Sequence, residues 1–235
     1  MKKLVLSIVS VLSVILFTTF SQAASIQVGV TGQIAQIEAD GTETTGAGAN
    51  GAANTNSASA DHTVPIASFF AEYTSDYYGI TFGAEFIPSS ADVSDKVVTR
   101  SDTETSVTSD NTANSDERIF KAQASVENYM VGYAEIPVYN SMYLRLGIAQ
   151  IDVNTEEVAS SNGGNYGNET LDGINYGIGF KGEVADGVEM KIALEHNDFD
   201  TLSLTSTGNS VTTETNKISA DLDTTAVKVS VGYKF

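Results

Sequence analysis

Eight stretches of the chain alternate between apolar and polar residues. In the first stretch, for example, Val28 and Val30 alternate with Gln27 and Thr31. A period of two residues is typical of a β-strand whose two faces meet different surroundings. The pattern predicts strands within residues 25–38, 65–74, 77–87, 119–136, 142–151, 173–182, 188–197 and 225–235.

The fourth of these stretches, residues 119–136, does not reveal which of its faces is apolar. Tyr129, Met130 and Val131 follow one another directly, so both faces carry apolar side chains. This stretch and residues 217–235 are each long enough to hide a further crossing. Ten strands therefore remain an alternative to eight.

The connections between the predicted strands alternate in length. Residues 75–76, 137–141 and 183–187 form short connections, whereas residues 39–64, 88–118, 152–172 and 198–224 are long and polar. Long loops of this kind are uncommon in compact soluble domains. Outer-membrane barrels combine short periplasmic turns with long extracellular loops, and strands of about ten tilted residues cross a bilayer. The sequence predicts an all-β fold, an eight-stranded antiparallel transmembrane β-barrel, in preference to a soluble β-sandwich.

The N-terminal segment has the pattern of a secretory signal peptide. Lys2 and Lys3 precede the apolar residues 4–17, and the small residues Ser21 and Ala23 follow. We expect cleavage after Ala23, which gives a signal peptide of residues 1–23 and a barrel domain of residues 24–235. A membrane anchor is the alternative, but its apolar core would be short for a helical span.

The composition is acidic and excludes several classes of function. The chain has 30 Asp+Glu against 12 Lys+Arg and a formal net charge of -18. Nucleic-acid binding requires basic patches, so we expect no nucleic-acid partner. The chain contains no Cys, which excludes disulfides and thiolate metal sites. We expect neither a cofactor nor a metal centre.

The polar faces of the predicted strands carry charges of both signs. These residues are Glu72, Glu85, Arg145, Lys181, Glu189, Lys191, Glu195 and Lys228. The interior of an eight-stranded barrel is just wide enough for side chains to fill, and buried charges must be paired. We therefore expect a plug of ion pairs inside the barrel. A narrow ion path lined by the same residues is the alternative.

Aromatic residues gather around two of the short connections and at the C-terminus. They are Tyr73, Tyr77, Tyr78, Tyr139, Tyr143, Tyr233 and Phe235. Aromatic girdles mark the membrane–water interfaces of such barrels, so the pattern predicts a girdle at the periplasmic end. Ordinary strand propensity explains part of the same enrichment.

Neither histidine forms a convincing catalytic motif. His62 lies in a polar stretch, and His196 has Asp198 and Asp200 nearby but falls on the lipid-facing side of its strand. We expect no catalytic residues and no enzymatic activity. Acidic residues of the long connections could share divalent cations with lipopolysaccharide, although a solvated surface is the simpler interpretation.

The C-terminal strand resembles the terminal signature of outer-membrane barrels. Residues 227–235 alternate in the required way and end on Phe235, with the aromatic Tyr233 two residues earlier. In that family these aromatics are read by the barrel-assembly machinery. The overall plan resembles the small barrels of the OmpA/OmpX and opacity-protein type. The resemblance implies a location in the cell outer membrane and contact with its lipid and lipopolysaccharide.

These observations favour a structural or surface-interaction role. The barrel would be the anchor, and the long acidic loops would meet a surface ligand that the sequence does not identify. The alternatives are a small passive channel for ions or solutes and, less favoured, a barrel enzyme. We expect a monomer.

Overall fold

The computed structural model describes most of the predicted barrel domain. It describes residues 25–44, 55–76, 78–94, 98–107, 113–159, 165–207 and 215–235, with the backbone alone for residues 98–107, 113–122 and 157–159. The predicted signal peptide and Tyr77 lie outside the described residues. Within the described part, no helix is long and apolar enough to cross a membrane.

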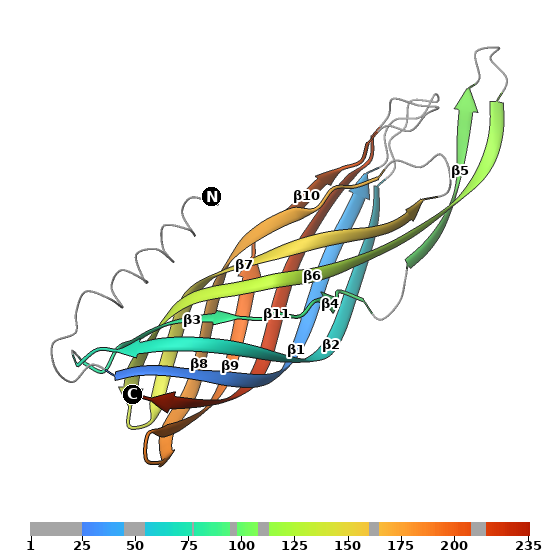
Figure 1. Ribbon diagram of the computed structural model, residues 1–235. Coiled ribbons are helices and arrows are strands. Elements are labelled where there is room, and N and C mark those ends of the chain that lie inside the picture. The colour runs from blue at the N-terminus through green and yellow to red at the C-terminus, as the bar shows by residue number, and fades with distance from the viewer. Residues whose placement is uncertain are drawn as a thin grey trace.

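Eight antiparallel strands form the wall, and it closes because β1 pairs with both β2 and β11 (Figure 1). The wall strands are β1 (Ser25–Thr44), β2 (Thr55–Thr74), β3 (Thr81–Phe86), β6 (Ala113–Tyr139), β7 (Met142–Ala159), β8 (Glu169–Ala185), β9 (Val188–Phe199) and β11 (Lys217–Lys234). Three further strands, β4 (Ala91–Asp92), β5 (Val98–Val107) and β10 (Leu202–Thr205), pair with β6 or β11. The predicted fold class is confirmed. The ten-strand alternative is wrong, because residues 119–136 and 217–234 each belong to one continuous strand.

The two ends of the barrel differ, and we call them the turn end and the hairpin end. The short connections and the C-terminus lie together at the turn end (Figure 1). At the hairpin end the strands continue far beyond their predicted limits; β1 and β2, for example, stay paired up to Thr44 and Thr55. The prediction that residues 39–64 form a loop is therefore wrong for the described residues 39–44 and 55–64, which belong to β1 and β2. The Thr residues of this segment favour strands. Because a two-stranded hairpin outside the membrane needs no apolar face, its strands carry no alternating pattern that would reveal them.

Apolar side chains cover the outside of the wall. On β1, Val28, Val30 and Ile34 are 45%, 53% and 62% exposed, and each of the other wall strands also carries exposed large apolar side chains. Toward the hairpin end this band gives way to polar residues such as Gln36 and Glu38. Hydrocarbon accepts such a surface only if the backbone groups are paired within the wall, which closure of the barrel provides.

Four of the predicted girdle aromatics point outward at the turn end. Tyr78, Tyr139, Tyr233 and Phe235 are exposed, and Tyr73 is half-buried. The prediction for Tyr143 is wrong, because this side chain is 1% exposed and lies inside the barrel. Its neighbour Leu144 faces lipid, so the alternation of the strand turns Tyr143 inward, on the same face as Arg145. A Cβ at the facing Gly179 would lie 2.5 Å from the Tyr143 ring, so only glycine leaves room for it.

A β-bulge in β6 explains why the faces of that strand could not be assigned from the sequence. Asn128 has a φ of 54°, and the register with β7 shifts between Glu127 and Met130. Between the bulge and the turn end, the buried residues of β6 are Val131, Tyr133 and Glu135. On the hairpin-end side of the bulge, Val126 is paired with the buried Val153 and therefore faces inward as well. The inward face of β6 thus changes from odd-numbered to even-numbered residues at the bulge.

The wall is interrupted between β2 and the segment after β3. The β2–β3 ladder runs only from the turn end to the pair Phe69–Phe86. Pro88 follows and lacks the N–H that a further ladder bond would need. The chain then enters β4, which pairs with β6 rather than with β2. Beyond Phe69, toward the hairpin end, β2 therefore pairs only with β1 among the described strands.

Candidate functional site

Two layers of ion pairs fill the half of the lumen nearest the turn end. We call the direction toward the hairpin end up and the direction toward the turn end down. In the upper layer, Arg145 Nη2 lies 2.7 Å from Glu85 Oε2, and Arg145 Nη1 lies 2.9 Å from Glu195 Oε1. Lys228 Nζ lies 2.9 Å from both carboxylates. Two positive and two negative charges cancel, and all four residues are at most 5% exposed. Ion pairs of this kind avoid the large cost of an isolated buried charge.

The lower layer repeats the arrangement with different residues. Lys191 Nζ lies 2.6 Å from Glu72 Oε2 and 2.9 Å from Glu135 Oε1. Lys181 contributes the second cation, 2.9 Å from Glu135 Oε2. The Tyr133 hydroxyl donates a 2.6 Å hydrogen bond to Glu72. A final pair, Glu189 and Lys234, lies closest to the turn end.

All eight predicted interior charges lie on the inner face of the wall, and the structure brings them together in pairs. Their role as pore lining remains a prediction. Sequence reasoning missed two partners, Glu135 and Lys234. Lys234 has the same parity as Lys228 along β11, so the alternation contained the signal. Glu135 faces Arg145 across the β6–β7 ladder, but a register shift on each side, at Glu127/Met130 and at Pro137/Tyr139, hid its inward direction from the sequence.

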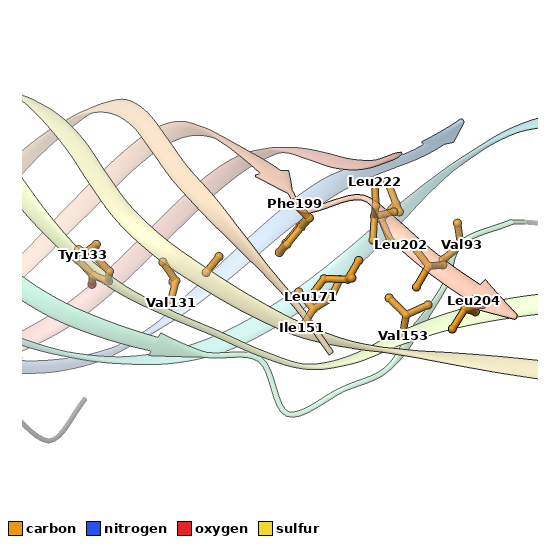
Figure 2. Packing of buried hydrophobic residues seen from close by; sticks show 12 residues of the cluster. Val93, Val131, Tyr133, Ile151, Val153, Leu171, Phe199, Leu202, Leu204 and Leu222 are labelled. Atoms are coloured by element: carbon orange, nitrogen blue, oxygen red, sulfur yellow. The ribbon is translucent and has the colours of Figure 1, made fainter. Parts of the chain in front are cut away.

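Above the ion pairs the interior becomes polar but uncharged, and then apolar. Asn197 accepts hydrogen bonds from Tyr129 and Asn175 and donates one to Thr224. Beyond it, buried apolar side chains follow the lumen toward the hairpin end, as Figure 2 shows. This cluster includes Ile37, Ile151, Val153, Leu171, Phe199, Leu202, Leu204 and Leu222. The lumen thus has an ionic lower half and an apolar upper half.

A cavity of about 570 Å³, including the space at its mouth, lies between the ion pairs and the apolar cluster. Its walls are mostly apolar and include Ala35, Ile37, Val126, Ile151, Phe199 and Ala226. Its floor is formed by Gln33, Glu195 and Lys228, next to the upper ionic layer. Its remaining lining includes Ile66 of β2 together with Ile87, Ser89 and Ala91, which lie on the two sides of the wall interruption. These residues place one edge of the cavity at the wall interruption.

The wall interruption lies at the edge of the lipid-facing band. Ile66 pairs with Gln33 and is followed by the pair Ile34–Pro65, in which Ile34 is exposed on the outside of the wall. Two residues further along β1, the outer face becomes polar at Gln36. A mouth at this level would meet the outer leaflet of the membrane.

Beyond the membrane band, the described hairpins contact one another. The Tyr166 hydroxyl donates a 2.9 Å hydrogen bond to Glu43, and Asn216 donates to the same carboxylate. These contacts connect the β1–β2 hairpin to the segments before β8 and β11. The β5–β6 hairpin projects away from the others (Figure 1).

A row of acidic residues crosses the outside of four neighbouring strands at this end. Asp61, Glu38, Asp223 and Asp198 are direct cross-strand neighbours on β2, β1, β11 and β9. Like charges at such positions repel one another. Among the described residues, no group of three or more His, Cys, Asp and Glu has a geometry that could hold a metal ion.

His196 lies on the outer surface near this row. Its Nδ1 is 2.9 Å from Thr225 Oγ1, and its ring lies 5.1 Å from the Tyr176 ring. Asp223 is 3.8 Å from its Nε2, which is too long for a hydrogen bond. These contacts place His196 in an exposed aromatic and polar cluster rather than in a cleft.

No protein-family model and no curated protein sequence matches the chain. Among solved structures it is similar to the outer membrane protein OprG from Pseudomonas aeruginosa, with a TM-score of 0.51 and 11% identity over 91% of this chain and 96% of that chain. Ail of Yersinia pestis gives a TM-score of 0.35 and 12% identity over 88% and 99%. Neisserial surface protein A gives a TM-score of 0.33 and 11% identity over 86% of this chain and 97% of that chain. The likeness to OprG bears on the fold, and the resemblance expected from the sequence is confirmed: the chain folds as a small outer-membrane β-barrel.

Proposed function

We propose that this barrel is closed along its axis and binds small apolar molecules in its upper half, exchanging them sideways with the outer leaflet. The observation that carries the proposal is the coincidence of the wall interruption with an apolar cavity. The β2–β3 ladder stops at Phe69–Phe86, and Ile66 and Ile87 line the cavity at that point. A complete wall would have separated this cavity from lipid.

The chemistry of the cavity supports an apolar ligand. Ligand pockets usually have mostly apolar walls with a few polar groups. The lining of this cavity has that composition, with Ala35, Ile37, Ile151 and Phe199 on its walls and Gln33 at its floor. Toward the hairpin end, the side chains of Leu202 and Leu204 belong to one buried cluster with Val93 and Val153, which favours entry from the side.

The test uses isoleucine methyl groups as reporters of binding. The mature chain would be refolded into lipid nanodiscs and titrated with octane, while methyl NMR follows Ile37 and Ile151 in the cavity and Ile178 and Ile192 on the lipid face. We expect saturable shifts at the cavity methyls only, since octane dissolved in the bilayer reaches the lipid-facing methyls without saturation.

A variant that fills the mouth provides the second part of the test. Ala91→Trp should weaken octane binding by about tenfold or more, because an indole would occupy the lateral entrance. Ala67→Trp is the matched control, since Ala67 lies next to Ile66 but points to lipid. Cavity methyls that merely follow the lipid-facing ones, or equal effects of both substitutions, would refute the proposal.

The interior geometry supports a sealed axis over a passive channel. Both ionic layers are internally neutralised, and their side chains are almost completely buried apart from Lys181. We expect the refolded protein to give no conductance steps in a planar bilayer. Reproducible steps that change when Glu72, Glu85 and Arg145 are replaced by alanine would instead favour the channel.

A surface-interaction role is a second candidate, and the acidic row across β2, β1, β11 and β9 favours it. Such a surface fits a cationic partner. Proteoliposomes should bind a polylysine-coated surface, and Glu38→Gln combined with Asp223→Asn should reduce this binding. Asp76→Asn, on an exposed turn at the opposite end, is the control. Equal binding by both variants would argue against a role for the row.

A further inference from the structure

The floor of the cavity differs from its walls, and this difference bears on the ligand. Glu195 and Lys228 contribute charge, but both are already engaged. Glu195 contacts Arg145 Nη1 and Lys228 Nζ at 2.9 Å each, and Lys228 also contacts Glu85. Among the described residues that line the cavity, no unpaired cation is available for a negatively charged head group.

Other polar groups near the floor also have partners. Asn197 uses its carbonyl for Tyr129 and Asn175 and its amino group for Thr224. Glu127, higher on the wall, accepts a hydrogen bond from Asn154. The lining therefore carries two carboxylates, Glu127 and Glu195, against the single cation Lys228. This balance disfavours an anionic ligand.

Gln33, at the floor of the cavity, has no such partner. Its side chain is 7% exposed and lines the cavity, and its amide forms no hydrogen bond with the described residues. Because the amide faces the cavity, its hydrogen-bonding groups are available to a molecule that binds there. An amide offers both donors and an acceptor, so it matches an uncharged polar group such as a hydroxyl or amide.

We infer that the ligand is a single-chain amphiphile whose uncharged polar head hydrogen-bonds to Gln33, while its apolar chain lies against Ile37, Ile151 and Phe199. The inference rests on the proposed function, because it concerns the same cavity. It adds a chemical class and a specificity-determining residue. In this arrangement the head lies on the floor above the ion pairs, and the chain extends toward the lateral mouth.

The experiment compares ligands of one chain length in the refolded mature protein in nanodiscs. The probes are octane, 1-octanol and octanoate, and the readout is again the saturable shift of the Ile37 and Ile151 methyls. The variant Gln33→Leu keeps the side-chain size but removes the amide. Gln36→Leu, on the same strand but outside the wall, is the control. Migration of the unheated protein on gels verifies that each variant is folded.

We expect Gln33→Leu to weaken 1-octanol binding by about fivefold to tenfold, as expected for one lost hydrogen bond. Octane binding should change by less than about twofold, because it makes no such bond. Comparing variants for each ligand cancels differences in lipid partitioning. Gln36→Leu should change neither affinity, and octanoate should show no saturable binding.

The outcomes separate the two proposals. If octane saturates the cavity but Gln33→Leu leaves 1-octanol binding unchanged, the inference about the head group is wrong and the proposed function stands. Preferred binding of octanoate would also overturn the inference about an uncharged head group and leave the proposed function intact. If neither octane nor 1-octanol saturates the cavity methyls, the proposed function itself fails.

Discussion

Arg145 is the residue whose replacement tests the interior plug most sharply. It contacts Glu85 at 2.7 Å and Glu195 at 2.9 Å, and its Nε donates a 3.1 Å hydrogen bond to Asn175. Its guanidinium also lies 3.4 Å from the centre of the Tyr133 ring. Arg145→Met removes these interactions while keeping a side chain of similar length.

The expected cost follows from the charge count of the upper layer. After the substitution, two buried carboxylates share the single cation Lys228, so the layer changes from neutral to a net charge of −1. Removing one partner of a buried ion pair costs about 3–5 kcal/mol. The double variant Arg145→Met with Glu195→Gln restores neutrality, because one carboxylate then faces Lys228. We expect it to regain about 2 kcal/mol of the loss.

The assay is reversible guanidinium unfolding in lipid vesicles, followed by circular dichroism because the chain contains no Trp. Lys234→Met serves as the control, since Lys234 pairs with Glu189 but its side chain is 29% exposed. We expect this variant to lose at most about 1 kcal/mol of unfolding free energy. Equal losses for Arg145→Met and Lys234→Met, or a double variant less stable than the single one, would refute the charge-balance reasoning.

Three further predictions concern other parts of the barrel. Gly83→Ala should lower the free energy of unfolding by about 1–3 kcal/mol in the same assay, because the new Cβ would lie 2.4 Å from the Tyr133 ring; an unchanged value would show that the ring moves freely. Glu38→Gln should raise it by about 0.2–1 kcal/mol at low salt by relieving repulsion from Asp61 and Asp223, and the gain should shrink at high salt. Phe235→Ala should lower the fraction of heat-modifiable barrel in cell membranes while leaving refolding into pure lipid nearly unchanged, and equal losses in both settings would indicate a structural role instead.

The strand pattern could be predicted because it depends on a local rule. Each wall strand separates lipid from the lumen, so the period of two appears directly in the sequence, as with Val28 and Val30 against Gln27 and Thr31. The prediction failed where a local irregularity changed the rule. The bulge at Asn128 exchanges the two faces of β6, and no residue pattern on either side of it marks the change.

The candidate cavity could not be predicted, because it depends on pairing between distant residues. Gln33, Ile87 and Asn197 come from separate strands, and nothing in their local sequence brings them together. The end of the β2–β3 ladder has a partial signal in Pro88, which cannot extend a ladder. The sequence does not reveal that the chain after Pro88 pairs with β6 and leaves β2 beyond Phe69 without a second neighbour among the described strands.

The change from an ionic to an apolar interior links the two halves of the molecule. Along β9 the inward residues are Glu189, Lys191, Ala193, Glu195, Asn197 and Phe199, and along β11 they run from Lys228 through Ala226 to Leu222. Paired charges dominate the lower half, so we expect an apolar molecule to bind above them. The β2–β3 ladder ends at that same level, at Phe69–Phe86, and not lower, where a gap in the wall would expose the ionic layers to lipid at a large free-energy cost. The position of the ladder's end therefore fits the proposed barrel, which is closed along its axis and open to the membrane from the side.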